Sequence, residues 1–452
     1  MKKISIFVPA LLLLSVGAVA ADKTDSSVDF DMRSPGKTPA WTFDFPAVPQ
    51  KPEPAPDDDR VWAVVGAADR DARNAAADSG MSIDVVSPDS VAGVATPGSI
   101  ARLKAAGLRV LSTRPLEIES ALDFPPADSA YHTYDQTMSE LAAIAARAPD
   151  LSSVFSIGRT WEGREIKVLR LCPDAAGQKP SRLPGILFIG LHHSREHLSA
   201  ETPLLLARRL VESRGDPQVA RLLQSRDIYV IPMLNPDGAE HDIQGGRYGL
   251  WRKNMRPGGR TGSSTGVDLN RNYAWHWGTS GASPYPADET YRGPSAFSEP
   301  ETQAVKAFVE SRANLTTLLS YHTFDEMILY PWSDTDAPMK DAEALKAYRA
   351  MAQAMGRMTG YTPMQSGALY ASSGDTADWS WGTRGIFSWT FELTPKSGTS
   401  TYAGFYPGAA AIAIAVQANW RPMLYLIDLA DDPRRVIRRS SAENVIAFAP
   451  PQ

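Results

Sequence analysis

The chain has 452 residues, of which 43% are hydrophobic and 21% charged. This length and composition favour one large and one small folded domain and exclude wholesale disorder. The 46 basic and 51 acidic residues give a formal net charge of -5. Because no long stripe of Lys and Arg accompanies that balance, nucleic-acid binding is not expected.

The first 20 residues have the pattern of a secretory signal peptide. Lys2 and Lys3 precede a mostly apolar run over residues 4–16, and Ala18-Val19-Ala20 supplies the small residues of a cleavage site. A membrane anchor is the alternative, but the run is shorter than the ~20 residues of a spanning helix and Pro9 interrupts it. We therefore expect a secreted or periplasmic protein with no stable membrane association after residues 1–20 are removed.

The chain contains a single cysteine, Cys172, so it has no internal disulfide. Residues 21–60 are expected to form a linker, because seven prolines lie between residues 33 and 60 among polar and acidic residues. Residues 61–122 have short apolar runs separated by helical stretches, which predicts a small α+β module. One predicted helix covers residues 99–107, with Ser99 as N-cap and Gly107 as stop.

Residues 129–430 alternate predicted strands and helices. This pattern predicts an α/β domain with a mixed central sheet and helices on both faces. Strands are predicted at 166–172, 184–190, 227–233, 315–321 and 386–391, helices at 200–213 and 299–312, and a turn at 235–238. Residues 431–452 are expected to form a solvated tail. Ligands of open α/β sheets bind beyond the carboxyl ends of the strands, and the polar clusters described next follow such ends.

The densest chemical signal is the segment from His192 to His197, which holds three of the seven histidines directly after a predicted strand. Imidazole and carboxylate groups are preferred ligands of Zn²⁺, and a catalytic zinc site keeps three protein ligands and one open position. A further ligand must come from elsewhere in the chain. His322 ends another predicted strand, so the sheet is expected to bring it beside the first cluster.

The same residues also fit a second set of zinc ligands. His193-Ser-Arg-Glu196-His197 also matches an H-x-x-E-H string, in which both histidines lie on a helix and the glutamate is the base. That arrangement requires the motif to lie inside a helix and an acidic ligand farther along the chain, such as Glu299. Here the motif begins where an apolar strand stops, which disfavours it.

Ordered landmarks over about residues 131–425 resemble the zinc carboxypeptidases of the carboxypeptidase A/B type, including secreted bacterial members similar to carboxypeptidase T. The landmarks are Tyr131-His-Thr-Tyr134, Ile157 to Arg164, Gly190 to Glu196, Asn235-Pro-Asp-Gly238, Trp251-Arg-Lys253, Gly266 to Asn272, Ser298-Glu299, Ser320-Tyr-His322 and Thr390-Phe-Glu-Leu393. The resemblance implies a zinc-dependent enzyme, most simply a monomer, that removes residues from the C-termini of peptides and proteins.

By this resemblance one Zn²⁺ is bound by His193, Glu196 and His322, the His₂Glu set known for carboxypeptidase A. His192 and His197 are then neighbours of the site. Asp268 matches the aspartate that accepts the free N–H of a ligand histidine, which fixes its tautomer. Glu392 matches the general acid/base that serves a zinc-activated water.

The resemblance also assigns the substrate side of the site. Arg252 matches the cation that stabilises the charge developing on the carbonyl oxygen. Asn270 and Arg271 match the clamp on the substrate carboxylate, for which a guanidinium group is well suited. Tyr370 matches a mobile tyrosine that closes over the substrate. Arg195 matches an additional cation on the substrate side.

Two positions after Tyr370 bear on side-chain preference. Ala377 stands where carboxypeptidase A has isoleucine and carboxypeptidase B has aspartate, so the chain is a strict copy of neither. Asp375 resembles members with mixed preference, in which a carboxylate pairs with a basic side chain while the pocket still accepts apolar ones. The alternative is that Asp375 only stabilises a turn.

The N-terminal module lies where the family has its inhibitory activation segment, so the chain is expected to be a zymogen cleaved between Ile118 and Tyr131. A retained accessory domain is the alternative. Two further functions are kept open. A non-catalytic peptide-binding protein would usually lack the base, and a cell-wall enzyme acting on peptidoglycan stem peptides would share the zinc chemistry.

Overall fold

A computed structural model describes residues 59–116, 124–174, 177–244, 246, 248–258, 266–396 and 401–438 of the chain. The expected signal peptide, nearly all of the expected linker and part of the expected cleavage segment lie outside these residues. Below, the N-terminal module means residues 59–116 and the large domain means the described residues from 124 to 438. Both belong to one compact unit of the chain, residues 40–452.

The N-terminal module is a four-stranded antiparallel sheet, with strand order β2-β3-β1-β4, and two helices. Its elements are β1 (Val61–Gly66), α1 (Arg70–Asp78), β2 (Val85–Val86), β3 (Ser90–Ala95), α2 (Pro97–Ala105) and β4 (Val110–Pro115). The predicted N-cap of the second helix was wrong. Thr96 caps α2 and Ser99 completes a reciprocal capping box with it, because Pro97 is suited to the first helical position.

The large domain is built on an eight-stranded mixed sheet, which confirms the predicted fold class. Its strand order is β11-β10-β12-β9-β7-β8-β6-β5. The strands are β5 (Ser152–Arg159), β6 (Glu165–Leu171), β7 (Gly185–Ile189), β8 (Asp227–Ile231), β9 (Leu315–Thr323), β10 (Met327–Tyr330), β11 (Thr362–Gln365) and β12 (Phe387–Leu393). The neighbours β12, β9, β7 and β8 run parallel, so their carboxyl ends meet at one edge.

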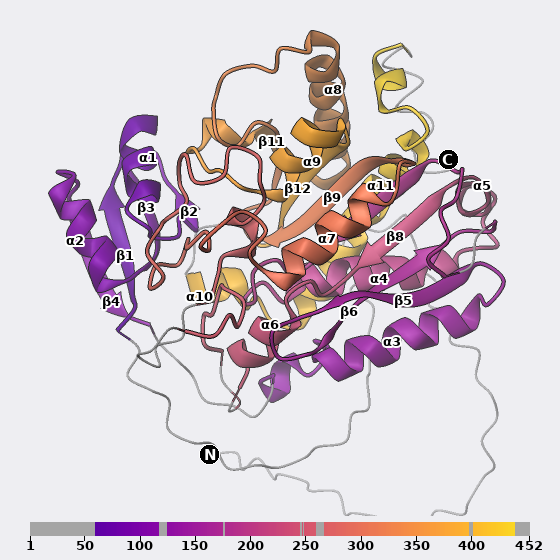
Figure 1. Ribbon diagram of the computed structural model, residues 1–452, viewed down its shortest axis with the longest axis horizontal. Helices are drawn as coiled ribbons and strands as arrows, with labels where there is room; N and C mark the ends of the chain where they lie inside the picture. Colours follow the sequence, from indigo (N-terminus) through magenta and orange to yellow (C-terminus); the bar gives the residue numbers. More distant parts are fainter. Residues whose placement is uncertain are drawn as a thin grey trace, which may run out of the picture. The chain divides into compact units, whose positions relative to one another are not determined.

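Helices cover both faces of this sheet (Figure 1). They are α3 (Tyr134–Arg147), α4 (Leu198–Glu212), α5 (Pro217–Ser225), α6 (Pro236–Asp242), α7 (Pro300–Glu310), α8 (Ala342–Thr359), α9 (Thr376–Arg384), α10 (Thr401–Phe405) and α11 (Ala410–Leu429). Successive residues of a strand point to opposite faces. Accordingly Phe188 of β7 packs in the core with α4, α8 and α11, whereas Leu187 packs in the core with α7 and α9.

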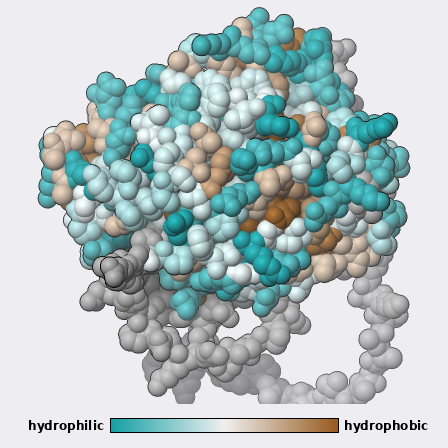
Figure 2. Space-filling view, viewed as in Figure 1, coloured by the Kyte–Doolittle hydropathy of each residue, from teal (hydrophilic) through white to brown (hydrophobic). Residues whose placement is uncertain are grey.

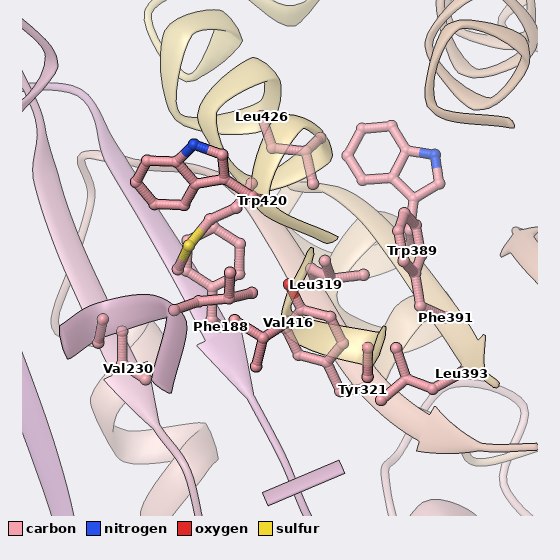
Figure 3. Close-up of a cluster of buried hydrophobic side chains, with 14 of the residues drawn as sticks. Phe188, Val230, Leu319, Tyr321, Trp389, Phe391, Leu393, Val416, Trp420 and Leu426 are labelled. Atoms are coloured by element: carbon pink, nitrogen blue, oxygen red, sulfur yellow. The ribbon is translucent and has the colours of Figure 1, made fainter. Parts of the chain in front are cut away.

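Figure 3 shows the larger of these two cores. Phe188, Tyr321 and Phe391 come from three neighbouring strands, and Val416 and Trp420 of α11 lie over them. Fully burying a side chain of this kind contributes about 1.5–3 kcal/mol. This apolar layer fixes the strands whose ends carry the polar residues described below.

Two expectations about local structure were wrong. Residues 235–238 begin helix α6 instead of forming a simple turn, since Asn235 caps the helix and Pro236 occupies its first position. The C-terminal segment is only partly solvated where the structure describes it. Residues 433–437 form a short 3-10 helix in which Val436 is buried, and Arg434 pairs with Asp341.

The surface seen in Figure 2 is mostly hydrophilic, with hydrophobic residues confined to small areas. Within the described part of the chain, no helix combines the length and the apolar character needed to cross a bilayer.

Candidate active site

The site lies where β12, β9 and β7 end side by side. His322 is near the end of β9, and Glu392 of β12 is its direct partner in the parallel register. His193 and Glu196 lie in the loop that follows β7 and precedes α4. Three neighbouring strand ends therefore bring together residues nearly 200 positions apart, as expected for an open α/β sheet.

The chain turns sharply after β7, and this turn positions the loop that carries His193 and Glu196. A Cβ atom on Gly190 would lie 2.2 Å from the backbone oxygen of Ser199 and 2.6 Å from that of Pro232, so only glycine fits. Leu191 follows with a φ of 57°. Helix α4 begins only at Leu198. The motif from His193 to His197 thus lies before the helix, and the helical H-x-x-E-H arrangement is not formed.

One buried group has its potential metal-ligand atoms turned toward a single point. It consists of His193, Glu196 and His322. Their potential ligand atoms lie within 4.8 Å of one another. The Nδ1 atom of His193 is 2.7 Å from Oε1 of Glu196, and Nδ1 of His322 is 3.0 Å from Oε2. The two Nδ1 atoms are 3.2 Å apart. Two imidazole nitrogens and a carboxylate facing one point are a donor set that fits Zn²⁺.

The outer nitrogens of both rings have partners that leave Nδ1 available for a metal. Nε2 of His193 lies 3.2 Å from Oδ1 of Asp268, and Nε2 of His322 lies 3.0 Å from the hydroxyl of Ser320. A proton on each Nε2 makes Nδ1 a lone-pair donor. Asp268 therefore contacts His193, as the family resemblance implied.

Asp268 also joins the metal group to Arg252. The Nε and Nη2 atoms of Arg252 each lie 2.9 Å from Oδ2 of Asp268. Burial acts to raise the pKa of Asp268, but the charges of Arg252 and His193 prevail and hold it well below its usual range. The carboxylate stays ionised and fixes both side chains.

The other two histidines of the cluster have different neighbours. His192 contacts the hydroxyls of Tyr273, Ser320 and Thr376, and burial lowers its pKa well below the usual range. Nε2 of His197 lies 2.8 Å from Oδ2 of Asp242. Neither belongs to the group that could hold a metal.

Glu392 lines the cavity in front of the metal group, together with Arg252, Asn270, Arg271, Tyr370 and Asp375. Burial raises the pKa of Glu392 well above its usual range, the nearby Glu196 carboxylate adds to the rise, and Arg252 opposes it. A carboxyl group with a raised pKa is a better proton acceptor and donor near neutral pH. Glu392 has the surroundings of a general acid/base.

The residues of the predicted carboxylate clamp, Asn270 and Arg271, also line the cavity. Arg271 is held by two backbone oxygens, with Nε 2.8 Å from that of Gly281 and Nη1 2.8 Å from that of Asn270. The side-chain oxygen of Asn270 accepts a bond from the backbone N–H of Thr376. These contacts fix both residues at the wall.

Asp375 is both an N-cap and part of the cavity lining. Its Oδ1 accepts the backbone N–H groups of Ala377 and Asp378 at the start of α9. Its Oδ2 is buried and has no hydrogen-bond partner among the described residues. Burial raises the pKa of Asp375, while the N–H of Asp378 and the charge of Arg271 oppose the rise. Ala377 does not line the cavity.

The N-terminal module also contributes to this cavity, through Ile83, Asp84 and Val86. Oδ1 of Asp84 lies 2.8 Å from Nη2 of Arg195, and the hydroxyl of Tyr370 donates to the backbone oxygen of Ile83 at 3.3 Å. Arg195 is therefore engaged by the module. The roles of these module residues could not be predicted from the sequence, because the module has no cluster of reactive side chains.

Helix α1 holds the segment that carries Tyr370. Arg70 and Arg73 donate from Nε to the backbone oxygens of Gly367 and Leu369, at 2.8 and 2.7 Å. The side-chain oxygen of Asn74 accepts the backbone N–H of Ala371 at 2.8 Å. Three side chains of one helix thus bind every second residue of segment 367–371.

A buried His-Glu-His group, with a buried carboxylate and a guanidinium group beside it, is typical of a metal-dependent hydrolase. The comparisons with known proteins agree. The chain matches the family model described as zinc carboxypeptidase over residues 137–422. It is 30% identical over 413 residues to a zinc carboxypeptidase of Saccharothrix mutabilis subsp. capreolus, covering 86% of this chain and 93% of that one.

Animal enzymes show the same relationship. Carboxypeptidase A1 of Bos taurus is 33% identical over 309 residues, covering 66% of this chain and 70% of that protein. The crystal structure of carboxypeptidase A from Helicoverpa armigera is similar with a TM-score of 0.67 and 25% identity, over 84% of this chain and 99% of that one.

The chain therefore belongs to the zinc carboxypeptidase family. It is a metallocarboxypeptidase, a zinc-dependent peptide hydrolase whose substrates are peptide C-termini. This sets aside the alternative of a non-catalytic binding protein.

Proposed function

We propose that the enzyme hydrolyses the C-terminal peptide bond with Glu392 as general acid/base and Arg252 as the cation that stabilises the oxyanion. The observation that carries this proposal is the pairing of Glu392 with His322 across β12 and β9, which puts the acid/base beside the ligand group. His193, Glu196 and His322 would hold the zinc.

Zinc held by these residues would supply a Lewis acid for the scissile carbonyl and for a water molecule. Glu392 accepts the proton of that water and passes it to the nitrogen of the departing amino acid. Its burial in the cavity lining supports both steps, because a raised pKa keeps the proton exchangeable near neutral pH.

Arg252 faces the negative charge that develops on the carbonyl oxygen. Its guanidinium group is fixed by Asp268 before substrate binds, so little reorganisation accompanies the reaction. Removing one such fixed donor typically costs about 2.7–4 kcal/mol of transition-state stabilisation. Asp268 contributes indirectly by holding both Arg252 and His193.

Asn270 and Arg271 would recognise the free C-terminus of the substrate. A guanidinium fork binds a carboxylate through two parallel hydrogen bonds, and Arg271 lines the cavity with its Nε and Nη1 already held by backbone oxygens. Tyr370 would close over the bound residue, and Arg195 would add a donor farther along the substrate. Two of these residues are engaged by the N-terminal module in this structure.

The pocket for the departing side chain would accept both basic and apolar residues. The unpartnered Oδ2 of Asp375 offers an acceptor to Lys or Arg. Leu329 and Thr390 line the same cavity and offer contact to apolar side chains. Because its other oxygen serves as an N-cap, Asp375 would combine the two roles that were left open.

The N-terminal module would act as an inhibitory prodomain. Asp84 and Ile83 line the cavity and engage Arg195 and Tyr370, which supports competition between the module and a substrate for these two residues. The signal-peptide pattern of residues 1–20 supports export to the periplasm or medium. We expect the processed enzyme to be monomeric, which light scattering tests.

The test is digestion of blocked peptides by the processed enzyme, read by mass spectrometry. We expect release of single C-terminal residues, and loss of that release in Glu392→Gln with zinc still bound. Full activity of Glu392→Gln would refute the assigned role. A library ending in Leu, Phe, Lys or Arg, with peptidoglycan stem peptides alongside, separates a general carboxypeptidase from a cell-wall enzyme.

A further inference from the structure

Four charged side chains alternate in sign where the N-terminal module meets the large domain. Nη1 of Arg60 lies 3.3 Å from Oε1 of Glu289, and Oε2 of Glu289 lies 3.2 Å from Nη1 of Arg195. Nη2 of Arg195 lies 2.8 Å from Oδ1 of Asp84. The outer members, Arg60 and Asp84, belong to the module, and the inner pair belongs to the large domain.

The inner pair keeps its own contact when the outer members leave. Ile83 and Asp84 of the module line the cavity that a substrate would enter, so we expect the module to move away before a substrate binds. Arg195 then loses Asp84 and the hydroxyl of Ser82 from Nη2. Nη1 keeps Glu289 and the backbone oxygen of Leu250. Oε1 of Glu289 loses Arg60. After the module leaves, Nη2 of Arg195 is an available N–H donor, and Oε1 of Glu289 is an available acceptor beside it.

We propose that Glu289 is a positioning and specificity residue for the upstream part of the substrate. It holds Nη1 of Arg195 so that Nη2 donates to a substrate carbonyl, and its Oε1 accepts an N–H from the same stretch of peptide. A peptide group offers one acceptor and one donor, which matches this pair. The preferred substrates are peptides that continue for several residues before the scissile bond. This inference rests on the proposed function of the cavity.

Contacts to residues on both sides of Glu289 fix the loop that carries it. Nζ of Lys253 donates to the backbone oxygens of Pro286 and Asp288, at 2.9 Å each. The backbone N–H of Asp268 donates to the oxygen of Tyr291 at 2.8 Å. Glu289 lies between these anchors. Its carboxylate therefore stays beside Arg195 when the module is absent.

Arg195 needs this partner for a physical reason. Its side chain is fully buried, and it lies with its guanidinium carbon 4.3 Å from the ring centre of Phe405. A buried guanidinium group without a carboxylate is costly, so it would turn away or draw in water. Glu289 keeps it paired and oriented beside Asp84, which lines the cavity.

The experiment compares an N-acylated dipeptide with an N-acylated tetrapeptide that has the same C-terminal residue. Full chains are folded and then freed of the module by limited proteolysis. We expect Glu289→Gln to raise KM for the tetrapeptide about tenfold, as for loss of a hydrogen bond to a charged group. The kcat value and the KM of the dipeptide stay unchanged. Glu289→Asp recovers part of the loss.

Asp288→Asn is the matched control. Asp288 is the neighbouring acid and contacts Ser283, Thr96 and Arg102, without a contact to Arg195. We expect this variant, once processed, to keep the KM of both peptides. Equal losses on both peptide lengths in Glu289→Gln would mark a purely structural role and overturn the inference, as would no loss on either. Failure of the unmutated enzyme to cleave any peptide would overturn the proposed function and this inference with it.

Discussion

Oδ1 of Asp268 lies 3.2 Å from Nε2 of His193, the ring nitrogen that faces away from the metal focus. Partners of this kind typically contribute 10–100-fold to metal affinity. We expect Asp268→Asn to weaken zinc binding by about this factor, because the amide is neutral and its NH₂ group is a poor partner for a protonated Nε2. Competition with a chelator, followed by metal analysis, measures it. An unchanged zinc affinity would contradict the predicted role.

Asp375→Asn tests the side-chain pocket. The substitution keeps the size of the side chain and one oxygen for the N-cap but removes the charge. We expect cleavage of C-terminal Lys and Arg to fall about tenfold or more, since a buried ion pair is lost, while Leu and Phe are released as before. Rates on four peptides that differ only in the last residue measure this. Equal retention of Lys and Arg cleavage would leave Asp375 with the capping role alone.

Glu301 gives the protein a pH-dependent stability outside the metal group. Burial raises its pKa to about 8, and the charges of Glu299 and Asp237 add to the rise. Its Oε2 accepts one bond from Asn254, and its Oε1 has no partner among the described residues. The folded protein therefore holds this proton more tightly than the unfolded chain, whose reference pKa is 4.5.

The difference between the folded and unfolded pKa values of Glu301 sets the direction in which stability changes with pH. The contribution of Glu301 is fully present below about pH 4.5 and is lost as the pH rises through about 8. Its slope is at most about 1.4 kcal/mol per pH unit. We expect Glu301→Gln to equal the unmutated protein at low pH and to exceed its free energy of unfolding near pH 9. Urea titrations at several pH values measure it, and parallel pH profiles would disprove the prediction.

The contacts of α1 predict a local change in the full chain. Arg73 and Asn74 each bind the backbone of segment 367–371. In a chain carrying Arg73→Ala and Asn74→Ala, we expect faster hydrogen exchange in this segment, because its backbone groups lose partners, and unchanged exchange in β9. Arg102→Ala breaks a contact of the same module to Asp288 and serves as the control. Unchanged exchange in the double variant would show that α1 does not hold the segment.

The large sheet was predictable because its central strands are continuous apolar runs, and parallel strands place their ends together. For the same reason, the residues after those runs could be assigned to one site. The position of His322 opposite Glu392 follows from strand order, which the sequence does not state. The family resemblance assigned both residues to one site without stating that order.

Other features leave weaker signals. Glu289 is a single acid in a loop, and only its contact with buried Arg195 distinguishes it from a surface residue. Arg70 and Arg73 bind backbone oxygens, so no complementary side chain marks their partners in the sequence. The 3-10 helix after α11 was missed because its arginines suggested a solvated tail.

Gly190 sets a limit on how far this sequence can vary. The end of β7, the start of α4 and the segment after β8 meet around a position with no room for a methyl group. Most buried positions accept a change of size at a moderate cost, because their neighbours are side chains that can shift. Here the neighbours are backbone atoms, and the residue three positions on is a predicted zinc ligand. A substitution at Gly190 would therefore remove metal binding and fold stability together, and no second change of a side chain nearby would restore them.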